Sequence, residues 1–163
     1  MVFLRKILSE DRERILDILT SPQVARTYML PDYEKREDAV PLFLRLMALS
    51  REEGKYVRAI ADEGGIIGFL NHTDIQGGNI ELGYVIHPIF QGRGYMTQAL
   101  GLAIKELFDL GCAEVITGAF STNAASIRVM EKCGMTRLDK TDEIDYRGTT
   151  HTCVYYRKKQ EQT

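Results

Sequence analysis

The sequence predicts an α/β protein: a mixed sheet with helices on its faces. Hydrophobic residues alternate with a period of two in some segments and recur every three to four residues in others, which separates strands from helices. These segments follow one another in the order β, α, α, β, β, β, α, β, α, β, β. The chain has 163 residues, 44% hydrophobic and 27% charged, which is typical of one globular domain. We therefore expect residues 1–163 to form a single domain.

The first third of the chain predicts one strand followed by helical segments. Val2 to Leu8 indicates a strand, and Ser9 is an N-cap residue for the helix after it. Pro22 starts a second, short helix. A further helical pattern runs from about Glu34 to Glu52, where Pro41 predicts a kink or a new start.

The middle of the chain predicts an antiparallel meander. Strand-like runs joined by tight turns occupy residues 56–61, 66–75 and 79–87. The clearest helix follows, because apolar residues between Met96 and Phe108 recur along one continuous face. Gly111 is placed as its C-cap.

The last third predicts a buried strand, a helix and a closing strand. Val115 to Phe120 is uncharged and rich in strand-forming residues. Asn123 to Cys133 has a helical pattern that Gly134 closes. Thr149 to Tyr156 alternates as a final strand.

Charge and composition exclude several classes of protein. Lys and Arg number 21 against 23 Asp and Glu, a net charge of −2, so we expect no nucleic-acid partner. No uncharged apolar run approaches 18 residues, so we expect no membrane span. Arg5 and Lys6 interrupt the start before a signal peptide could form, and the three widely spaced cysteines indicate free thiols in a reducing cytoplasm. No metal-ligand spacing occurs, so we expect no metal.

The segment from Gly83 to Met96 is the part of the sequence that indicates a binding site. A buried strand runs into a glycine-containing loop that opens the best helix of the chain. Such a loop exposes backbone N–H groups at a helix N-terminus, which favours a phosphate, although a tight turn without a ligand fits the same pattern. Neither a Walker A motif nor a dinucleotide fingerprint after the first strand is present.

At this loop the sequence resembles the GNAT superfamily of acetyl-CoA-dependent N-acetyltransferases. The family's pyrophosphate loop reads Q/R-x-x-G-x-G/A, and residues 91–96 match it except at the last position. Met96 stands there in place of a small residue, and its side chain would narrow the pyrophosphate path. Further matches, typical of a RimJ/RimL-like branch, follow in the expected order at Phe3–Arg5, Glu81–Tyr84, Asn123–Ser126 and Glu131–Met135.

The resemblance implies the fold and the cofactor contacts. The fold would be a mixed, mostly antiparallel sheet of six to seven strands flanked by helices. A bulge at Gly83 would let the strand leave its neighbour and pair with the pantetheine arm of acetyl-CoA. Asn123 would bind pantetheine, and either Ser126 or, in its place, a water molecule would protonate the departing thiolate. The implied cofactor-binding residues are Tyr84, Val85, Ile86, Gln91, Gly92, Arg93, Gly94, Tyr95, Met96, Asn123 and Ser126.

The acceptor amine needs a base, because only a neutral amine attacks a thioester. At pH 7 an α-amine is roughly a tenth neutral, and a lysine amine only about four parts in ten thousand. Glu81 is the first candidate for the base, acting through water, although an exposed edge carboxylate is the plainer interpretation. The expected catalytic residues are therefore Glu81 and Ser126, and the expected substrate-binding residues are Tyr28, Tyr33, His72 and Glu81.

Three functions stay open at this stage. The first is an N-acetyltransferase acting on a protein N-terminal α-amine or a small-molecule amine, as a monomer or homodimer. The second is a non-catalytic acyl-CoA sensor, because Met130 occupies the place where many relatives carry an acid tyrosine. The third is an interaction module in which the glycine loop is only a turn.

Overall fold

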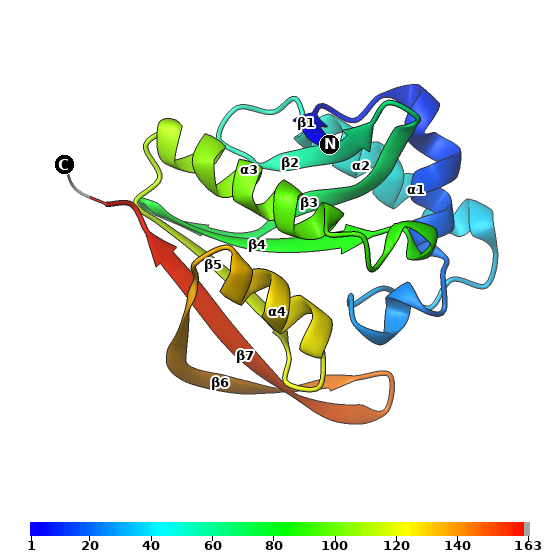
Figure 1. Ribbon diagram of the computed structural model, residues 1–163. Helices are drawn as coiled ribbons and strands as arrows, with labels where there is room; N and C mark the ends of the chain where they lie inside the picture. Colours follow the sequence, from blue (N-terminus) through cyan, green and yellow to red (C-terminus); the bar gives the residue numbers. More distant parts are fainter. Residues whose placement is uncertain (162–163) are drawn as a thin grey trace.

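The computed structural model describes residues 1–161, and these residues form a seven-stranded sheet (Figure 1). The strand order is β1-β2-β3-β4-β5-β7-β6, and every neighbouring pair is antiparallel except β4 and β5. The expected mixed, mostly antiparallel sheet is therefore confirmed. The strands are β1 (Phe3–Arg5), β2 (Val57–Asp62), β3 (Gly65–Gln76), β4 (Asn79–Ile86), β5 (Glu114–Phe120), β6 (Thr136–Tyr146) and β7 (Thr149–Lys159).

Helices cover both faces of the sheet and give it two cores. The α-helices are α1 (Arg12–Leu19), α2 (Val40–Leu49), α3 (Tyr95–Asp109) and α4 (Ala124–Lys132). Helices α3 and α4 lie on one face, and α1 and α2 lie on the other (Figure 1). Strand β4 serves both cores, since Leu82 and Ile86 belong to the α3/α4 core while Val85 belongs to the α1/α2 core. This alternation fixes which face each β4 side chain occupies.

The N-terminal half differs from the prediction in its helix and strand boundaries. The first strand covers Phe3–Arg5 alone, and the helix after Pro22 is a single 3-10 turn at Val24–Arg26. The pattern from Glu34 to Glu52 divides into a 3-10 turn at Arg36–Ala39 and the helix α2. Pro41 lies in the first turn of α2, where its missing N–H costs nothing, so it marks a new start.

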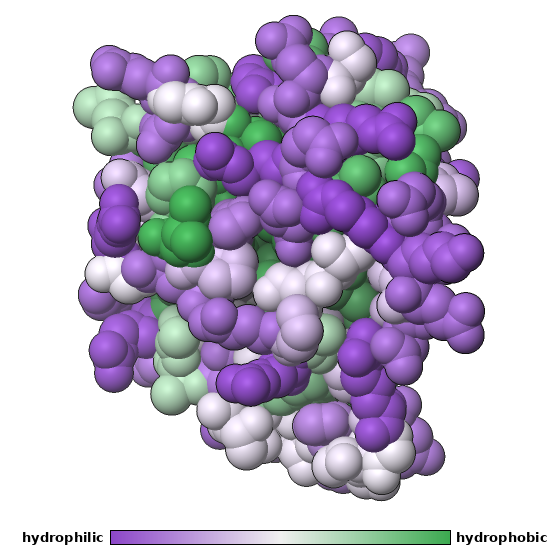
Figure 2. Space-filling model, turned by 90° about the vertical axis from the view of Figure 1, so that its right-hand side faces the viewer, coloured by the Kyte–Doolittle hydropathy of each residue, from purple (hydrophilic) through white to green (hydrophobic). Residues whose placement is uncertain are grey.

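The surface carries scattered apolar side chains. Figure 2 shows the face at the right of Figure 1, where hydrophilic residues surround small separate hydrophobic patches. Single exposed apolar residues of this kind are ordinary on a protein surface. Within residues 1–161 no helix has both the length and the hydropathy that crossing a membrane requires. Over the same residues, no group of three His, Cys, Asp or Glu side chains is placed to hold a metal.

Candidate active site

Strands β4 and β5 pair over half their length and then separate. Their parallel register joins Asn79 with Glu114, Ile80 with Val115, Glu81 with Ile116 and Leu82 with Thr117. Beyond these pairs β4 continues along β3, and β5 continues along β7, so the two strands diverge (Figure 1). In the described part of the chain, the β5-facing edge of Gly83–Ile86 therefore has no strand partner.

A glycine on β3 holds the end of β4 away from β5. A Cβ on Gly68 would lie 2.2 Å from the carbonyl oxygen of Val85 and 2.9 Å from Cα of Ile86, so only glycine permits this approach. The His87 N–H donates to the Ile67 carbonyl at 2.7 Å and fixes the strand end there. The close approach thus moves the last residues of β4 toward β3.

The expected bulge at Gly83 is wrong. Gly83 pairs in register with Asn71, and the register shift lies on β3, between His72 and Asp74. The side chain of Asn71 lies over Gly83, where a Cβ would stand 3.4 Å from Asn71 Oδ1. The divergence of β4 is therefore accompanied by the close approach at Gly68 and not by an extra residue in β4 itself.

A cavity of about 860 Å³ occupies the gap between the diverging strands. Its walls come from both faces of the sheet, including Tyr84 and Ser126 on the α4 side and Glu81 and Tyr155 on the opposite side. Most of the predicted site residues line it: Tyr28, Glu81, Tyr84, Val85, Ile86, Gln91, Gly92, Gly94, Tyr95, Met96, Asn123 and Ser126. The structure thus brings the loop, the strand edge and the start of α4 together around one space.

The glycine loop presents free backbone donors at one end of this cavity. Gly92 and Gly94 have φ of 76° and 79°, a left-handed conformation that glycine adopts without strain. Gly94 is the N-cap of α3 and supplies no side-chain cap. Within residues 1–161 the N–H groups from Tyr95 to Thr97 donate to no protein acceptor. These donors and the dipole of a 15-residue helix favour an anion.

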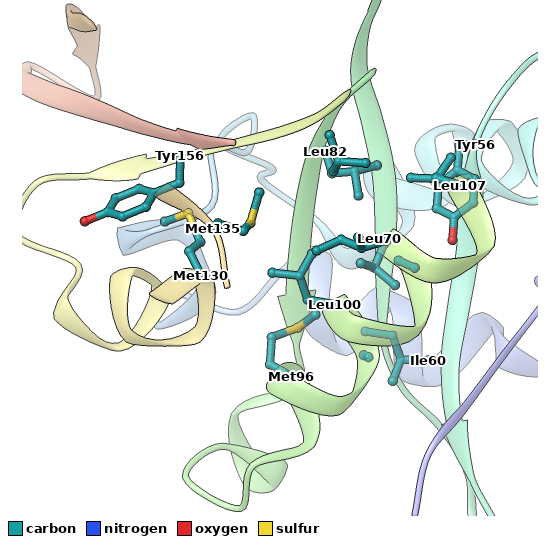
Figure 3. Close-up of a cluster of buried hydrophobic side chains, with 14 of the residues drawn as sticks. Tyr56, Ile60, Leu70, Leu82, Met96, Leu100, Leu107, Met130, Met135 and Tyr156 are labelled. Atoms are coloured by element: carbon teal, nitrogen blue, oxygen red, sulfur yellow. The ribbon is translucent and has the colours of Figure 1, made fainter. Parts of the chain in front are cut away.

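Two loop residues that the resemblance assigns to cofactor binding, Met96 and Arg93, lie in different surroundings. Met96 is 8% exposed and packs into the core beneath α3, close to Leu100 (Figure 3). Its departure from the family motif therefore leaves the amide at the helix start in place. Arg93 is exposed and lies outside the cavity wall, with its guanidinium carbon 6.0 Å from the centre of the Phe90 ring.

The start of α4 orients two polar side chains toward the cavity. Asn123 is the N-cap of α4, and its Oδ1 accepts from the Ser126 N–H at 3.2 Å. The Ser126 hydroxyl lies 2.5 Å from the Tyr84 hydroxyl across the cavity wall. Burial raises the pKa of Tyr84 to about 12, although the hydrogen bond between Tyr84 and Ser126 opposes this change. Tyr84 therefore keeps its proton at neutral pH.

The opposite wall holds the candidate base and an aromatic rim. The Thr73 hydroxyl donates to Glu81 Oε2 at 2.6 Å. The Tyr28 hydroxyl donates to Asn71 Oδ1 at 2.9 Å, and burial raises the pKa of this tyrosine well above its usual value. Among the residues 1–161 that line the cavity, Glu81 carries the one carboxylate. This wall is suited to a single amino group.

Two predicted substrate residues do not reach the cavity. His72 Nδ1 lies 3.2 Å from the Tyr56 backbone N and 3.0 Å from its carbonyl oxygen, so the ring is held against the backbone just before β2. Neither His72 nor Tyr33 belongs to the cavity wall that the described residues form. Sequence reasoning missed Gly118, Phe120, Cys153 and Tyr155, which do line it. Gly118 was the sequence signal for this part of the wall, because a single glycine within an apolar strand marks a close approach by another group.

Comparison with known proteins identifies the family. Residues 2–136 match the profile of the acetyltransferase (GNAT) domain. An uncharacterized N-acetyltransferase of Bacillus subtilis, YoaA, is 28% identical over 156 residues, which cover 91% of this chain and 87% of that protein.

Solved structures share the fold. Spermidine N-acetyltransferase of Vibrio cholerae superposes with a TM-score of 0.83 at 16% identity, covering 98% of this chain and 95% of the other. The Salmonella typhimurium acetyltransferase that modifies the N-terminal serine of a ribosomal protein gives 0.84 at 17% identity, covering 98% and 95%. The chain belongs to the GNAT acetyltransferase family and is an acyltransferase.

Proposed function

We propose that this protein transfers the acetyl group of acetyl-CoA to a primary amine, either a protein N-terminal α-amine or a small-molecule amine, by direct attack in a ternary complex. One observation carries the proposal. A single cavity joins an uncapped helix N-terminus, an unpaired strand edge and one carboxylate. An anion, an extended arm and an amine are the three groups that such an arrangement fits.

The residues present fit acetyl-CoA. The amides of the loop from Gly92 to Met96 would hold the pyrophosphate, and Arg128 and Lys132 on α4 line the same cavity with positive charge. The edge of β4 from Tyr84 to Ile86 would pair with the pantetheine arm as an added strand. When bound, acetyl-CoA supplies a thioester whose carbonyl carbon is the electrophile.

Glu81 is the proposed base, on the face of the sheet opposite α4. It accepts from Thr73 at 2.6 Å and lines the cavity, so its second oxygen is available to an ammonium group or to a water between them. It would take the proton that the amine nitrogen loses as the new amide bond forms. An α-amine needs less of this help than a lysine amine, since roughly a tenth of it is already neutral at pH 7.

Ser126 is the proposed acid, on the face of the sheet that α3 and α4 cover. Met130, at the position of the acid tyrosine in many relatives, is fully buried in the α3/α4 core (Figure 3). It has no proton to donate. Ser126 lines the cavity one turn earlier, and its hydroxyl would protonate the sulfur as the carbon–sulfur bond breaks.

The acceptor is proposed from the charge on the Glu81 wall. A single carboxylate suits one ammonium group, whereas a polyamine would call for several. The structurally similar proteins include both a spermidine enzyme and an enzyme of ribosomal protein N-termini. The sequence motifs favour the RimJ/RimL-like branch. We further propose a single cytoplasmic domain that works as a monomer or homodimer.

Calorimetric titration followed by a thiol-release assay tests the proposal. Acetyl-CoA and desulfo-CoA should bind and ATP should not, because the strand edge selects the pantetheine arm. A panel of peptides and small amines should then yield turnover, and Glu81→Gln should lower kcat/KM about 100-fold. Glu143→Gln is the matched control, because Glu143 accepts from Thr152 at 2.8 Å in a similar cross-strand pair outside the cavity.

The outcomes separate the candidate functions. Binding of acetyl-CoA without turnover of any amine would replace the enzyme by an acyl-CoA sensor. No heat with either CoA ligand would show that the loop is only a turn. Equal losses in Glu81→Gln and Glu143→Gln would remove Glu81 from the reaction.

A further inference from the structure

Tyr84 is a partly buried tyrosine whose hydroxyl reaches across the cavity wall to α4. Its oxygen lies 2.5 Å from Ser126 Oγ and 3.3 Å from the Ser126 carbonyl oxygen. The ring packs against the α3/α4 core, so the hydroxyl has a fixed position. Strand β4 thus supplies a second hydroxyl to the place where the proposed function needs a proton.

We propose that Tyr84 is a positioning residue and proton source for Ser126: it donates its O–H to Ser126 Oγ, directs the serine hydrogen at the departing sulfur, and replaces that hydrogen once it has gone. This inference rests on the proposed function. It goes beyond it, because a lone serine is a poor acid, whereas a serine backed by a phenol passes on a phenolic proton.

The geometry leaves the serine few other orientations. The Ser126 N–H is bound to Asn123 Oδ1 at 3.2 Å, which fixes the backbone. The Tyr84 contact then fixes the side chain. With one lone pair of Oγ accepting from Tyr84, the serine hydrogen is free to point at a third group. The cavity offers the space for that group, since both residues line it.

The reaction releases one proton from the amine on one face of the sheet and takes up one proton at sulfur on the other. The amine nitrogen forms a bond to the acetyl carbon, the carbon–sulfur bond breaks, and its electron pair leaves with sulfur. Sulfur takes the hydrogen of Ser126, Ser126 takes that of Tyr84, and the phenolate takes a proton from water. On the other face Glu81 receives the amine proton and returns it to water. No other reactant is needed.

The charge state of Tyr84 agrees with this role. Burial raises its pKa to about 12, so it stays protonated and remains a donor in the resting protein. The high pKa also makes the phenolate short-lived, because it recovers its proton readily. The contact with Ser126 opposes the effect of burial on this pKa, because a serine hydroxyl that has received the phenolic proton can donate back to the phenolate oxygen.

A double-mutant cycle tests the inference. Tyr84→Phe removes only the hydroxyl and should lower kcat about tenfold with little change in the KM for acetyl-CoA. Ser126→Ala should lower kcat at least as far. Because Tyr84 acts through Ser126, the double variant should be no slower than Ser126→Ala alone. Tyr156→Phe is the matched control, since Tyr156 is 8% exposed in the same core and lies outside the cavity.

A binding readout complements the kinetics. The oriented Ser126 hydroxyl should make CoA bind more tightly than desulfo-CoA, and this preference should shrink in Tyr84→Phe. Independent, multiplicative losses in the double variant would overturn the inference, as would a Tyr84→Phe protein equal to Tyr156→Phe in kcat and in CoA preference. If the wild-type protein turns over no amine at all, the proposed function fails and this inference falls with it.

Discussion

Both halves of β4 pair with β3 on one side, but only the first half pairs with a strand, β5, on the other side. From Asn79 to Leu82 the strand is paired with both β3 and β5. From Gly83 to Ile86 it is paired with β3 alone and faces the cavity. The first half completes the sheet, and the second half offers an open edge to a ligand. In this molecule the open edge, which we propose to bind acetyl-CoA, arises where the pairing of β4 with β5 ends.

Glycines on β3 and β5 lie beside the open second half of β4, and we propose that the one on β3 keeps this half open. Gly68 lets β4 approach β3, as its Cβ position would overlap the Val85 carbonyl. Gly118 on β5 leaves room for side chains of β7, since a Cβ there would lie 2.9 Å from the Tyr155 ring and 3.2 Å from Cys153 Sγ. The contact at Gly68 brings the backbones of β3 and β4 together, whereas the contacts at Gly118 are with side chains only. The first half of the pair has no such close approach at a glycine on β3 or β5.

Breaking the contact at Gly68 should have the largest effect. In Gly68→Ala the new methyl group meets backbone that cannot rotate away, so the end of β4 must move toward β5. We expect the free energy of unfolding to fall by about 3 kcal/mol and acetyl-CoA affinity to fall with it. Denaturant unfolding and calorimetry measure the two effects.

Gly101→Ala is the matched control for this substitution. Gly101 lies within α3 with open space around its Cβ position, so alanine should stabilise the protein by about 0.5–1 kcal/mol. A Gly68→Ala protein as stable as Gly101→Ala, with unchanged affinity for acetyl-CoA, would contradict the proposed cause of the divergence.

A smaller effect should follow at the last paired residue of β5. Thr117 is fully buried, and within residues 1–161 its hydroxyl lies near the Tyr84 hydroxyl but makes no hydrogen bond of good geometry. Thr117→Val removes an unsatisfied polar group, so thermal unfolding should show a gain of about 1 kcal/mol. A loss of similar size would show instead that this hydroxyl is bonded in solution and supports the end of the strand pair.

The sequence predicted the parts of the site that are close together along the chain. The strand, loop and helix from Gly83 to Met96 form one continuous segment whose pattern and glycines are local signals. The cap at Asn123 is equally local, and the structure retains its capping role. The glycine-loop motif and the hydrophobic periodicity were therefore sufficient to predict which residues form the wall made by β4, the loop and the start of α4.

The far wall could not be predicted, because it depends on distant pairing. Tyr155 reaches the site because β7 inserts between β5 and β6, an order that no local pattern reveals. His72 was misplaced for a related reason. The register shift next to it, between His72 and Asp74, interrupts the simple alternation along β3, and its ring binds the Tyr56 backbone.

Hydrogen–deuterium exchange with and without acetyl-CoA tests the contrast within β4 most directly. Saturating acetyl-CoA should slow amide exchange at residues 83–86 and at the loop amides from Gly92 to Thr97. Exchange at residues 79–82 should not change, because β3 and β5 already pair with that half. Equal slowing along the whole of β4, or no slowing at residues 83–86 in a saturated complex, would contradict the assignment of the open edge as the ligand's strand partner.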